Sequence, residues 1–250
     1  MKKTVFIMLL ICVFLLSACG APVNEAPETT TGADQTTAAA DLTDSEIYDE
    51  FLSRLSNRLA RIIIDDTLLD GFDLLEGMAG VAEIANLREL DMLDKIGYAI
   101  LDINEDGTAE LLIFDIRKSG DSDMKLKGIL CAYTVSDNEA VLLLEGTSQN
   151  CYYLLDDGAV LNRNYVDTTV SNIGVYRLDK EGTELTCVDY YFTATDGNNQ
   201  QVWYQNQNGA QDIAGSVVVS GGAEGFDTVQ NELTSRIQAV EMTPFSVLVQ

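Results

Sequence analysis

Apolar residues first recur with a helical period in the segment that follows residue 42. Thr43 and Glu46 match a capping box, in which two side chains bond the backbone amides of a helix start. The apolar positions of this segment are spaced by four and three residues, as one face of a helix requires: Ile47, Phe51, Leu55, Leu59 and Ile62. The pattern predicts a helix from about Asp44 to Ile64.

A second and shorter helical pattern follows Gly71. Its apolar positions are Leu74, Leu75, Met78, Val81, Ile84 and Ala85. This spacing predicts a second helix that ends near Arg88. A third helix is expected near the C-terminus, where Asp227 precedes apolar residues spaced by four, namely Val229, Leu233 and Ile237.

Beyond Lys95 the apolar period changes to two, and β-branched or aromatic runs alternate with Gly-containing turns. These runs predict strands at residues 97–103, 110–116, 126–135, 139–147, 150–155, 159–165, 172–178, 184–194 and 200–205. Asp157-Gly158 is typical of a two-residue hairpin turn, and Asp137-Asn138 predicts another. Because short loops join these strands, we expect a mainly antiparallel β-sheet body with two N-terminal helices and one near the C-terminus, which is an α+β domain over residues 45–250.

The first twenty residues follow a different pattern. Lys2 and Lys3 precede an unbroken apolar run, Val5 to Leu16, which is too short to span a bilayer and typical of a signal-peptide core. Leu-Ser-Ala-Cys follows and resembles the lipobox of bacterial lipoproteins. The resemblance implies a signal peptide over residues 1–18, a lipid on Cys19, and a location on the extracytoplasmic face of the membrane. A plain export signal with an incidental cysteine is the alternative.

Residues 19–44 have little to bury. They are rich in Thr, Ala and acidic residues and contain two of the three prolines of the chain. Such a composition does not offset the conformational entropy lost on ordering. We therefore expect a lipidated cysteine followed by a disordered tether.

Charge and composition exclude several classes of function. The formal charge of the chain is −25, and removal of Lys2 and Lys3 with residues 1–18 would make it −27. Such a chain repels nucleic acid and anionic lipid. The chain contains no histidine, which excludes Ser-His and Cys-His nucleophiles and imidazole metal sites. The three cysteines after residue 45 (Cys131, Cys151 and Cys187) can form one disulfide at most or remain thiols.

The sequence LDINEDGTAELLI, residues 101–113, carries the most specific chemistry. Its oxygen donors fall at the alternate positions 1, 3, 5, 7 and 9 of a calcium loop, and Gly107 falls at position 6, where the chain must turn sharply. The candidate ligands are Asp102, Asn104, Asp106, the carbonyl of Thr108, and Glu110. Position 12 is Ile113 where an EF-hand has a bidentate Glu, and the flanking runs are strands, so the loop joins a β-hairpin. A purely polar turn is the alternative, since Asp, Asn and Gly favour any turn.

This hairpin resembles the calcium hairpins of integrin-type FG-GAP repeats, with Asn104 and Glu110 at positions where those repeats have Asp. A single copy is present, so the resemblance covers about a dozen residues and implies no propeller. The wider arrangement, with lipobox, Thr-rich tether, helices, hairpin, YYLLDDGAV and VYRLDKEGTEL, resembles a group of uncharacterised lipoproteins and secreted proteins of Gram-positive gut bacteria. That resemblance bears on location and fold more than on activity.

Three classes of function remain after these exclusions. We expect a surface-anchored binding module with one structural calcium ion and a protein or glycan ligand, rather than an enzyme. A carboxylate-dependent extracellular hydrolase of the glycosidase type is the alternative, because a pair of acids needs no histidine. A solute receptor is disfavoured, since the chain lacks the βαβ pattern of two α/β lobes. Asp121 and Asp123 could complete the ion site or solvate a loop.

Overall fold

A computed structural model of the protein describes residues 43–65, 72, 77–86, 89–117, 128–166 and 169–249. Its helices are α1 (Asp44–Ile64), α2 (Ala79–Ala85) and α3 (Ala223–Ser235), with short 3-10 turns η3 (Met92–Asp94) and η4 (Phe245–Val247). No helix among these residues is long and apolar enough to cross a membrane. The predicted signal peptide, Cys19, nearly all of the predicted tether, and Asp121 and Asp123 lie outside the described residues.

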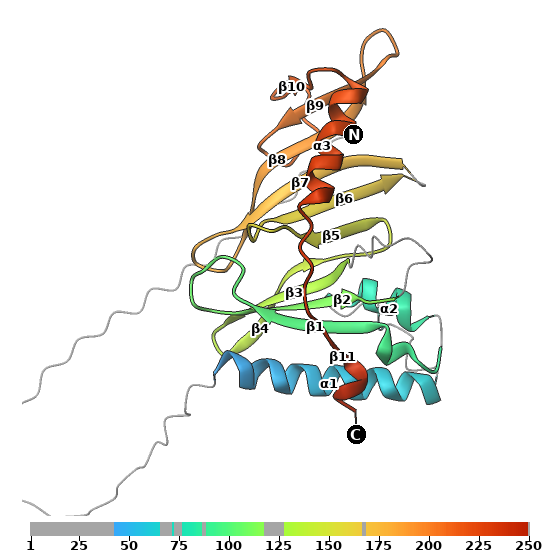
Figure 1. Ribbon diagram of the computed structural model, residues 1–250, viewed down its shortest axis with the longest axis vertical. Helices are drawn as coiled ribbons and strands as arrows, with labels where there is room; N and C mark the ends of the chain where they lie inside the picture. The colour runs from blue at the N-terminus through green and yellow to red at the C-terminus, as the bar shows by residue number, and fades with distance from the viewer. Residues whose placement is uncertain are drawn as a thin grey trace, which may run out of the picture. The chain divides into compact units, whose positions relative to one another are not determined.

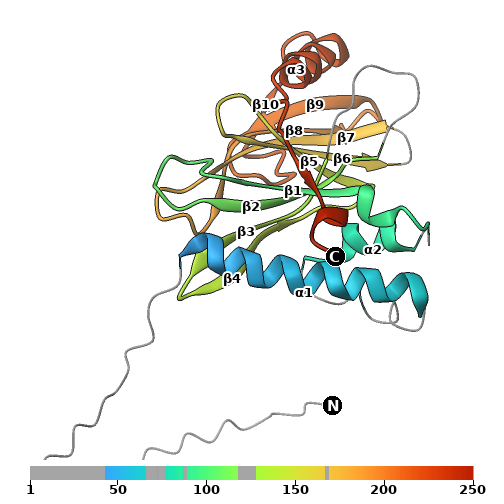
Figure 2. The ribbon, with the colours of Figure 1, turned by 60° about the horizontal axis from the view of Figure 1, so that its bottom comes forward.

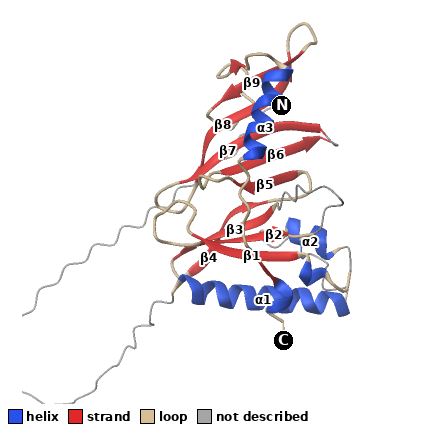
Figure 3. Cartoon of the chain, in the orientation of Figure 1, coloured by secondary structure: helices blue, strands red, loops and turns tan. Residues whose placement is uncertain are grey.

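The strands form one sheet in which every pairing is antiparallel (Figure 1). They are β1 (Ile96–Leu101), β2 (Glu110–Asp115), β3 (Ile129–Ser136), β4 (Glu139–Glu145), β5 (Asn150–Leu154), β6 (Val160–Val166), β7 (Thr169–Leu178), β8 (Leu185–Thr195), β9 (Gln201–Asn206), β10 (Val217–Val218) and β11 (Thr243–Pro244). Their order is β10-β9-β8-β7-β6-β5-β3-β2-β1-β11, and β4 pairs with β3 outside this path. The predicted α+β class with a mainly antiparallel sheet is confirmed (Figure 3).

The two halves of the sheet meet where β3 pairs with β5. These two strands share a single registered pair, Ile129 with Tyr152, whereas each long hairpin of the sheet has several. An apolar cluster spans this junction: it combines Ala99, Leu112, Phe114, Ile129, Ala132 and Leu144 of the first half with Leu154 and Val160 of the second. The sheet continues through this junction as one layer, and its strands follow one another from β9 to β1 in Figure 1, while Figure 2 shows the two halves from another side.

The helices pack against different parts of the sheet. Both α1 and α2 pack on the half made of β1 to β4, while α3 packs on the half made of β5 to β9. The hydroxyl of Tyr48 in α1 donates to the carbonyl oxygens of Ala109 and Tyr133 at 2.9 and 3.1 Å. This contact fastens α1 to the end of the β1–β2 loop. The apolar core consists of a cluster beneath α1 and α2, a cluster beneath α3, and two further clusters, one over β1 to β6 and one over β8 and β9.

The bounds of α1 agree with the prediction, and its capping box is formed by Thr43 and Glu46. The described part of the second helix, α2, is shorter than predicted, and residues 73–76 and 87–88 lie outside the described part of the chain. Helix α3 begins earlier than Asp227, because Phe226 in its first turn packs into the core beneath it. The type of both helices was predicted correctly, and the predicted end of the second helix, near Arg88, lies outside the described residues.

The predicted turns and cysteines have mixed outcomes. Asp137 and Asn138 form the expected two-residue turn, both with positive φ. The turn at Gly158 contains one residue more than predicted, because the amide of Leu155 donates to the carbonyl oxygen of Ala159. Cys131, Cys151 and Cys187 are free thiols in this structure. Strands β10 and β11 were not predicted, since two residues are too few to show a period.

Candidate functional site

The calcium-type run forms the connection between β1 and β2, as the sequence predicts. Leu101 pairs with Glu110 in antiparallel register, so residues 102–109 form the loop of a β-hairpin. Glu105 and Gly107 both have positive φ, at 61° and 96°. At Gly107 no atom would meet an added Cβ, so the need for glycine there is conformational.

The loop curls around its own polar side chains. The carboxylate of Asp102 accepts hydrogen bonds from the amides of Asp106 and Gly107, at 3.2 and 2.9 Å. Asp106 accepts from the amide of Thr108 at 2.7 Å and from the side-chain amide of Asn104, also at 2.7 Å. Four of the predicted ligand residues, at loop positions 1, 3, 5 and 7, are thus linked in one chain of hydrogen bonds.

Glu110 belongs to the same site but differs in its burial. It is 0% exposed, and one carboxylate oxygen accepts from the amide of Ile103 in the loop at 3.0 Å. The other oxygen, Oε1, has no hydrogen-bond partner among the described residues. Buried carboxylate oxygens are normally paired, so an oxygen without a partner at the end of this loop is one that a cation could occupy.

The surroundings of Glu110 are unfavourable for its charge. The pKa of its carboxyl is raised to about 7, mainly by burial and in part by the nearby charges of Asp106 and Asp102, while the amide of Ile103 opposes the shift. The ionised form is therefore poorly compensated by the chain itself. A bound divalent cation would compensate it, since nearby positive charge favours the carboxylate.

The described residues do not form a ready-made metal cage. Among them, no three acidic or cysteine side chains converge as they would around an ion. The predicted ligands are instead joined by hydrogen bonds, from the side chain of Asn104 to Asp106 and from the loop amides to Asp102 and Asp106. An ion would have to draw the carboxylates of Asp102, Asp106 and Glu110 closer together, against the repulsion that separates like charges.

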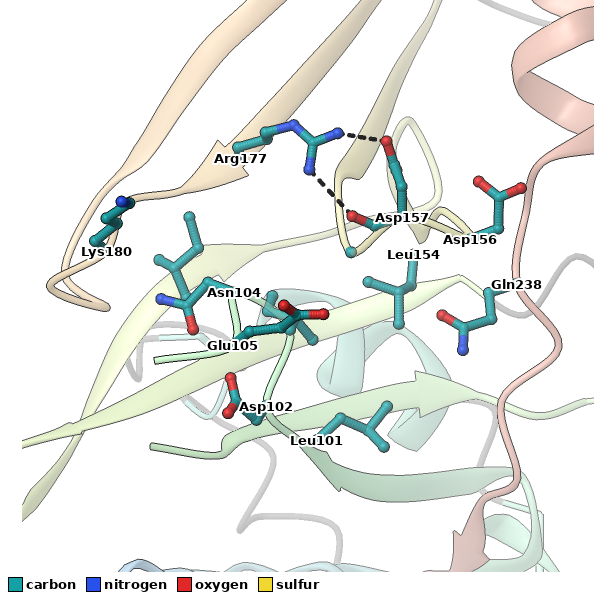
Figure 4. A pocket seen from close by; sticks show the side chains of 13 residues that line it. Leu101, Asp102, Asn104, Glu105, Leu154, Asp156, Asp157, Arg177, Lys180 and Gln238 are labelled. Atoms are coloured by element: carbon teal, nitrogen blue, oxygen red, sulfur yellow. Dashed lines mark hydrogen bonds and ion pairs between the residues drawn. The ribbon is translucent and has the colours of Figure 1, made fainter. Parts of the chain in front are cut away.

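A cleft of about 670 Å³ adjoins the loop (Figure 4). Its lining comes from four segments that are distant in the sequence: the β1–β2 loop, the β5–β6 turn, the end of β7, and the segment that follows α3. The charged side chains of its lining are those of Asp102, Glu105, Asp156, Asp157, Arg177 and Lys180. Leucine side chains at 101, 154 and 178 supply its apolar surface.

Asp157 organises one side of this cleft. Its carboxylate forms ion pairs with Arg177 and Arg236, and a main-chain oxygen of Asp157 accepts a further bond from Arg177 at 3.0 Å. Partial burial opposes the ionisation of Asp157, but the amide of Ala159 and the two guanidinium groups together hold its pKa below the ordinary value. Asp157 is therefore a fixed anion that positions Arg177, and its oxygens are occupied.

The same geometry bears on the hydrolase alternative. A glycosidase acid needs a raised pKa and access to the scissile bond. Glu110 has the raised pKa, but it is buried and does not line the cleft. Asp157 lines the cleft, but its pKa is lowered. Neither Glu110 nor Asp157 therefore combines a raised pKa with access to the cleft.

The sequence did not reveal two contacts of this site. The side chain of Asn104 donates to the main-chain oxygen of Asp179 in the β7–β8 turn at 2.6 Å. Gly158 lies so close to the loop that an added Cβ would overlap the carbonyl oxygen of Ile103. The positive φ of Gly158 was foreseeable from the turn pattern, but neither contact partner was, because both lie far away in the sequence.

Comparisons of the chain with protein-family models, with curated proteins and with solved structures gave no match.

Proposed function

We propose that this protein is a lipid-anchored bacterial surface protein, a binding module whose β1–β2 hairpin holds one structural calcium ion. The ligands of the ion are Asp102, Asn104, Asp106, the carbonyl of Thr108, and Glu110. The observation that carries the proposal is the unpaired Oε1 of the fully buried Glu110, against a loop whose positions follow a calcium motif. Residues 1–19 support the anchor on Cys19 through their resemblance to a lipobox.

The cleft beside the hairpin is the proposed ligand site of the module. It combines leucine side chains with the charged groups of Glu105 and Lys180, as binding sites combine apolar surface with a few polar groups. The ligand is a protein or a glycan presented outside the cell. Calcium has a structural role in this proposal, since it relieves the repulsion among the carboxylates of a loop that lines the cleft through Asp102.

A calcium titration of thermal unfolding tests the ion site. With a dissociation constant of about 0.1 mM, about 1 mM calcium would stabilise the fold by roughly 1.4 kcal/mol. For a domain of this size we expect the melting temperature to rise by about 3 to 6 °C relative to EDTA. The variant Asp106→Ala should lose this rise.

Asp196→Ala is a matched control for that experiment. Asp196 opens the β8–β9 turn and accepts from the amides of Asn198 and Gln200 at 2.8 and 2.9 Å, much as the loop aspartates do. It lies outside the calcium motif, so this variant should keep the full calcium response. If calcium up to about 10 mM leaves the native melting temperature unchanged, the hairpin is only a polar turn.

A further inference from the structure

The β7–β8 turn rests directly on the proposed calcium loop. The side-chain amide of Asn104 donates to the main-chain oxygen of Asp179 at 2.6 Å. In the same turn, a Cβ added to Gly182 would lie 2.9 Å from Oδ2 of Asp106. Two of the proposed ligands therefore touch a segment that lies more than seventy residues further along the chain.

The turn is ordered internally by the side chain of Asp179. Its carboxylate accepts from the amides of Thr183 and Glu184 at 2.7 and 3.1 Å and from the hydroxyl of Thr183 at 3.1 Å. These bonds hold the pKa of Asp179 below its ordinary value. Gly182 has a φ of 69°, which closes the turn. A turn held in this way moves as a unit, and it carries Lys180, which lines the cleft.

Asn104 is suited to connect the ion with this turn. The oxygen and nitrogen of a side-chain amide point in different directions from one planar group. The oxygen accepts from the amide of Asp106 inside the loop at 3.3 Å, while the nitrogen donates both to the carboxylate of Asp106 and outward to the main-chain oxygen of Asp179. Aspartate at this position could supply an oxygen to an ion, but it has no N–H to donate. The contact gives a physical reason for Asn104 where FG-GAP hairpins have Asp.

We propose that calcium binding fastens the β7–β8 turn through Asn104 and thereby sets the position of Lys180 at the cleft. When the ion holds the oxygen of Asn104, the nitrogen of the same amide is directed at Asp179. The ion thus regulates one wall of the ligand site without touching it. This inference rests on the proposed calcium function, and Asn104 has the role of a positioning residue for the turn.

Hydrogen exchange of the full chain, followed by mass spectrometry in EDTA and in calcium, tests the coupling. We expect calcium to slow exchange in the loop at residues 102–110. The turn at residues 179–184 should slow by about fivefold, as expected when one hydrogen bond is strengthened. The turn at residues 196–200 is the internal control and should be unaffected.

The variant Asn104→Asp separates ion binding from the coupling. It retains an oxygen ligand, so calcium should still slow exchange in residues 102–110, whereas the effect on residues 179–184 should disappear. Exchange in β5 to β8 reports in the same experiment whether the variant is folded. The matched variant Asn198→Asp, in the control turn, should leave both calcium effects intact.

The possible failures are distinguishable. Protection of the loop without protection of residues 179–184 in the native chain would overturn the coupling and leave the calcium site standing. Persistence of the turn protection in folded Asn104→Asp would also overturn it. Absence of protection in both segments would overturn the calcium site and the coupling together.

Discussion

Glu110 is buried because of its place in β2. Side chains alternate between the two faces of a strand, so Glu110 points to the same face as Leu112 and Phe114. Those two side chains pack in the cluster that spans the junction of β3 and β5. A carboxylate at the first position of this strand is thereby carried to the edge of an apolar layer. The motif alone marks Glu110 as a ligand, but it does not reveal this burial.

The raised pKa of Glu110 predicts a pH dependence of stability for the metal-free protein. The folded pKa of about 7 exceeds the ordinary value of 4.5, so the folded state binds more protons between these two values. The free energy of unfolding should therefore fall as pH rises from about 5 to 8, by up to about 3 kcal/mol from this group. Below about pH 4.5 this carboxyl no longer makes the free energy of unfolding depend on pH, because it is protonated in both the folded and the unfolded state.

Urea unfolding in EDTA at several pH values, for the native chain and for Glu110→Gln, measures this contribution. The comparison is needed because the acidic surface also destabilises the fold as pH rises. The variant cannot ionise at this position, so its stability should fall less steeply between pH 5 and 8. Parallel curves for the two proteins would mean that Glu110 does not titrate in this range.

At the scale of elements, the β1–β2 loop is supported by two other connections. The β5–β6 turn approaches it at Gly158, and the β7–β8 turn approaches it at Gly182. Both glycines have positive φ and both face atoms of the loop. The loop is thus part of a packed corner of the domain, which explains how a change at the ion could reach the cleft.

A pair of glycine variants tests this packing in the absence of calcium. Gly107 and Gly158 both have positive φ, but only Gly158 has a backbone atom in the space of an added Cβ. In EDTA we expect Gly107→Ala to lower the free energy of unfolding by about 1 kcal/mol. Gly158→Ala should cost about 2 to 4 kcal/mol, since the turn must also move away from the loop. Equal losses, measured by urea unfolding, would contradict the close approach.

At the scale of the whole molecule, the proposal assigns binding to the residues from 43 onward and attachment to those before them. Residues 41–250 form one unit by their contacts, and the described part of that unit contains the cleft and the hairpin. The proposed anchor lies in the other unit, at Cys19. The formal charge of −25 disfavours attachment to anionic lipid by charge alone, so a covalent lipid is the expected means of attachment.

Replacement of Cys19 tests the anchor in a bacterial host that lipidates lipoproteins. Two acyl chains give stable membrane attachment, so the native chain should remain with the membrane fraction and enter the detergent phase on phase separation. Cys19→Ala should move to the aqueous phase. Cys12→Ala, which changes a cysteine inside the apolar run, should behave like the native chain. An aqueous native chain would favour the plain export signal.

The sequence by itself determined the helix α1, the strands β1 to β9 and the position of the hairpin loop. Each of these follows from local periodicity or local turn chemistry, and both depend only on residues that are close together in the sequence. The calcium motif was recognisable for the same reason, because its candidate ligands lie within nine residues. The lengths of α2 and α3 were less predictable, since packing such as that of Phe226 extends or ends a helix.

Only the tertiary structure decided the surroundings of the loop. The sheet passes from β3 to β5 through the single pair of Ile129 and Tyr152, and no local pattern marks that point. The tertiary structure brings Gly158 and Asp179 onto the β1–β2 loop and forms the cleft. Such contacts depend on the packing of apolar faces between segments distant in the sequence, whereas periodicity within one segment specifies only which face is apolar. The sequence therefore predicted the candidate ligands, and the fold alone supplied their partners.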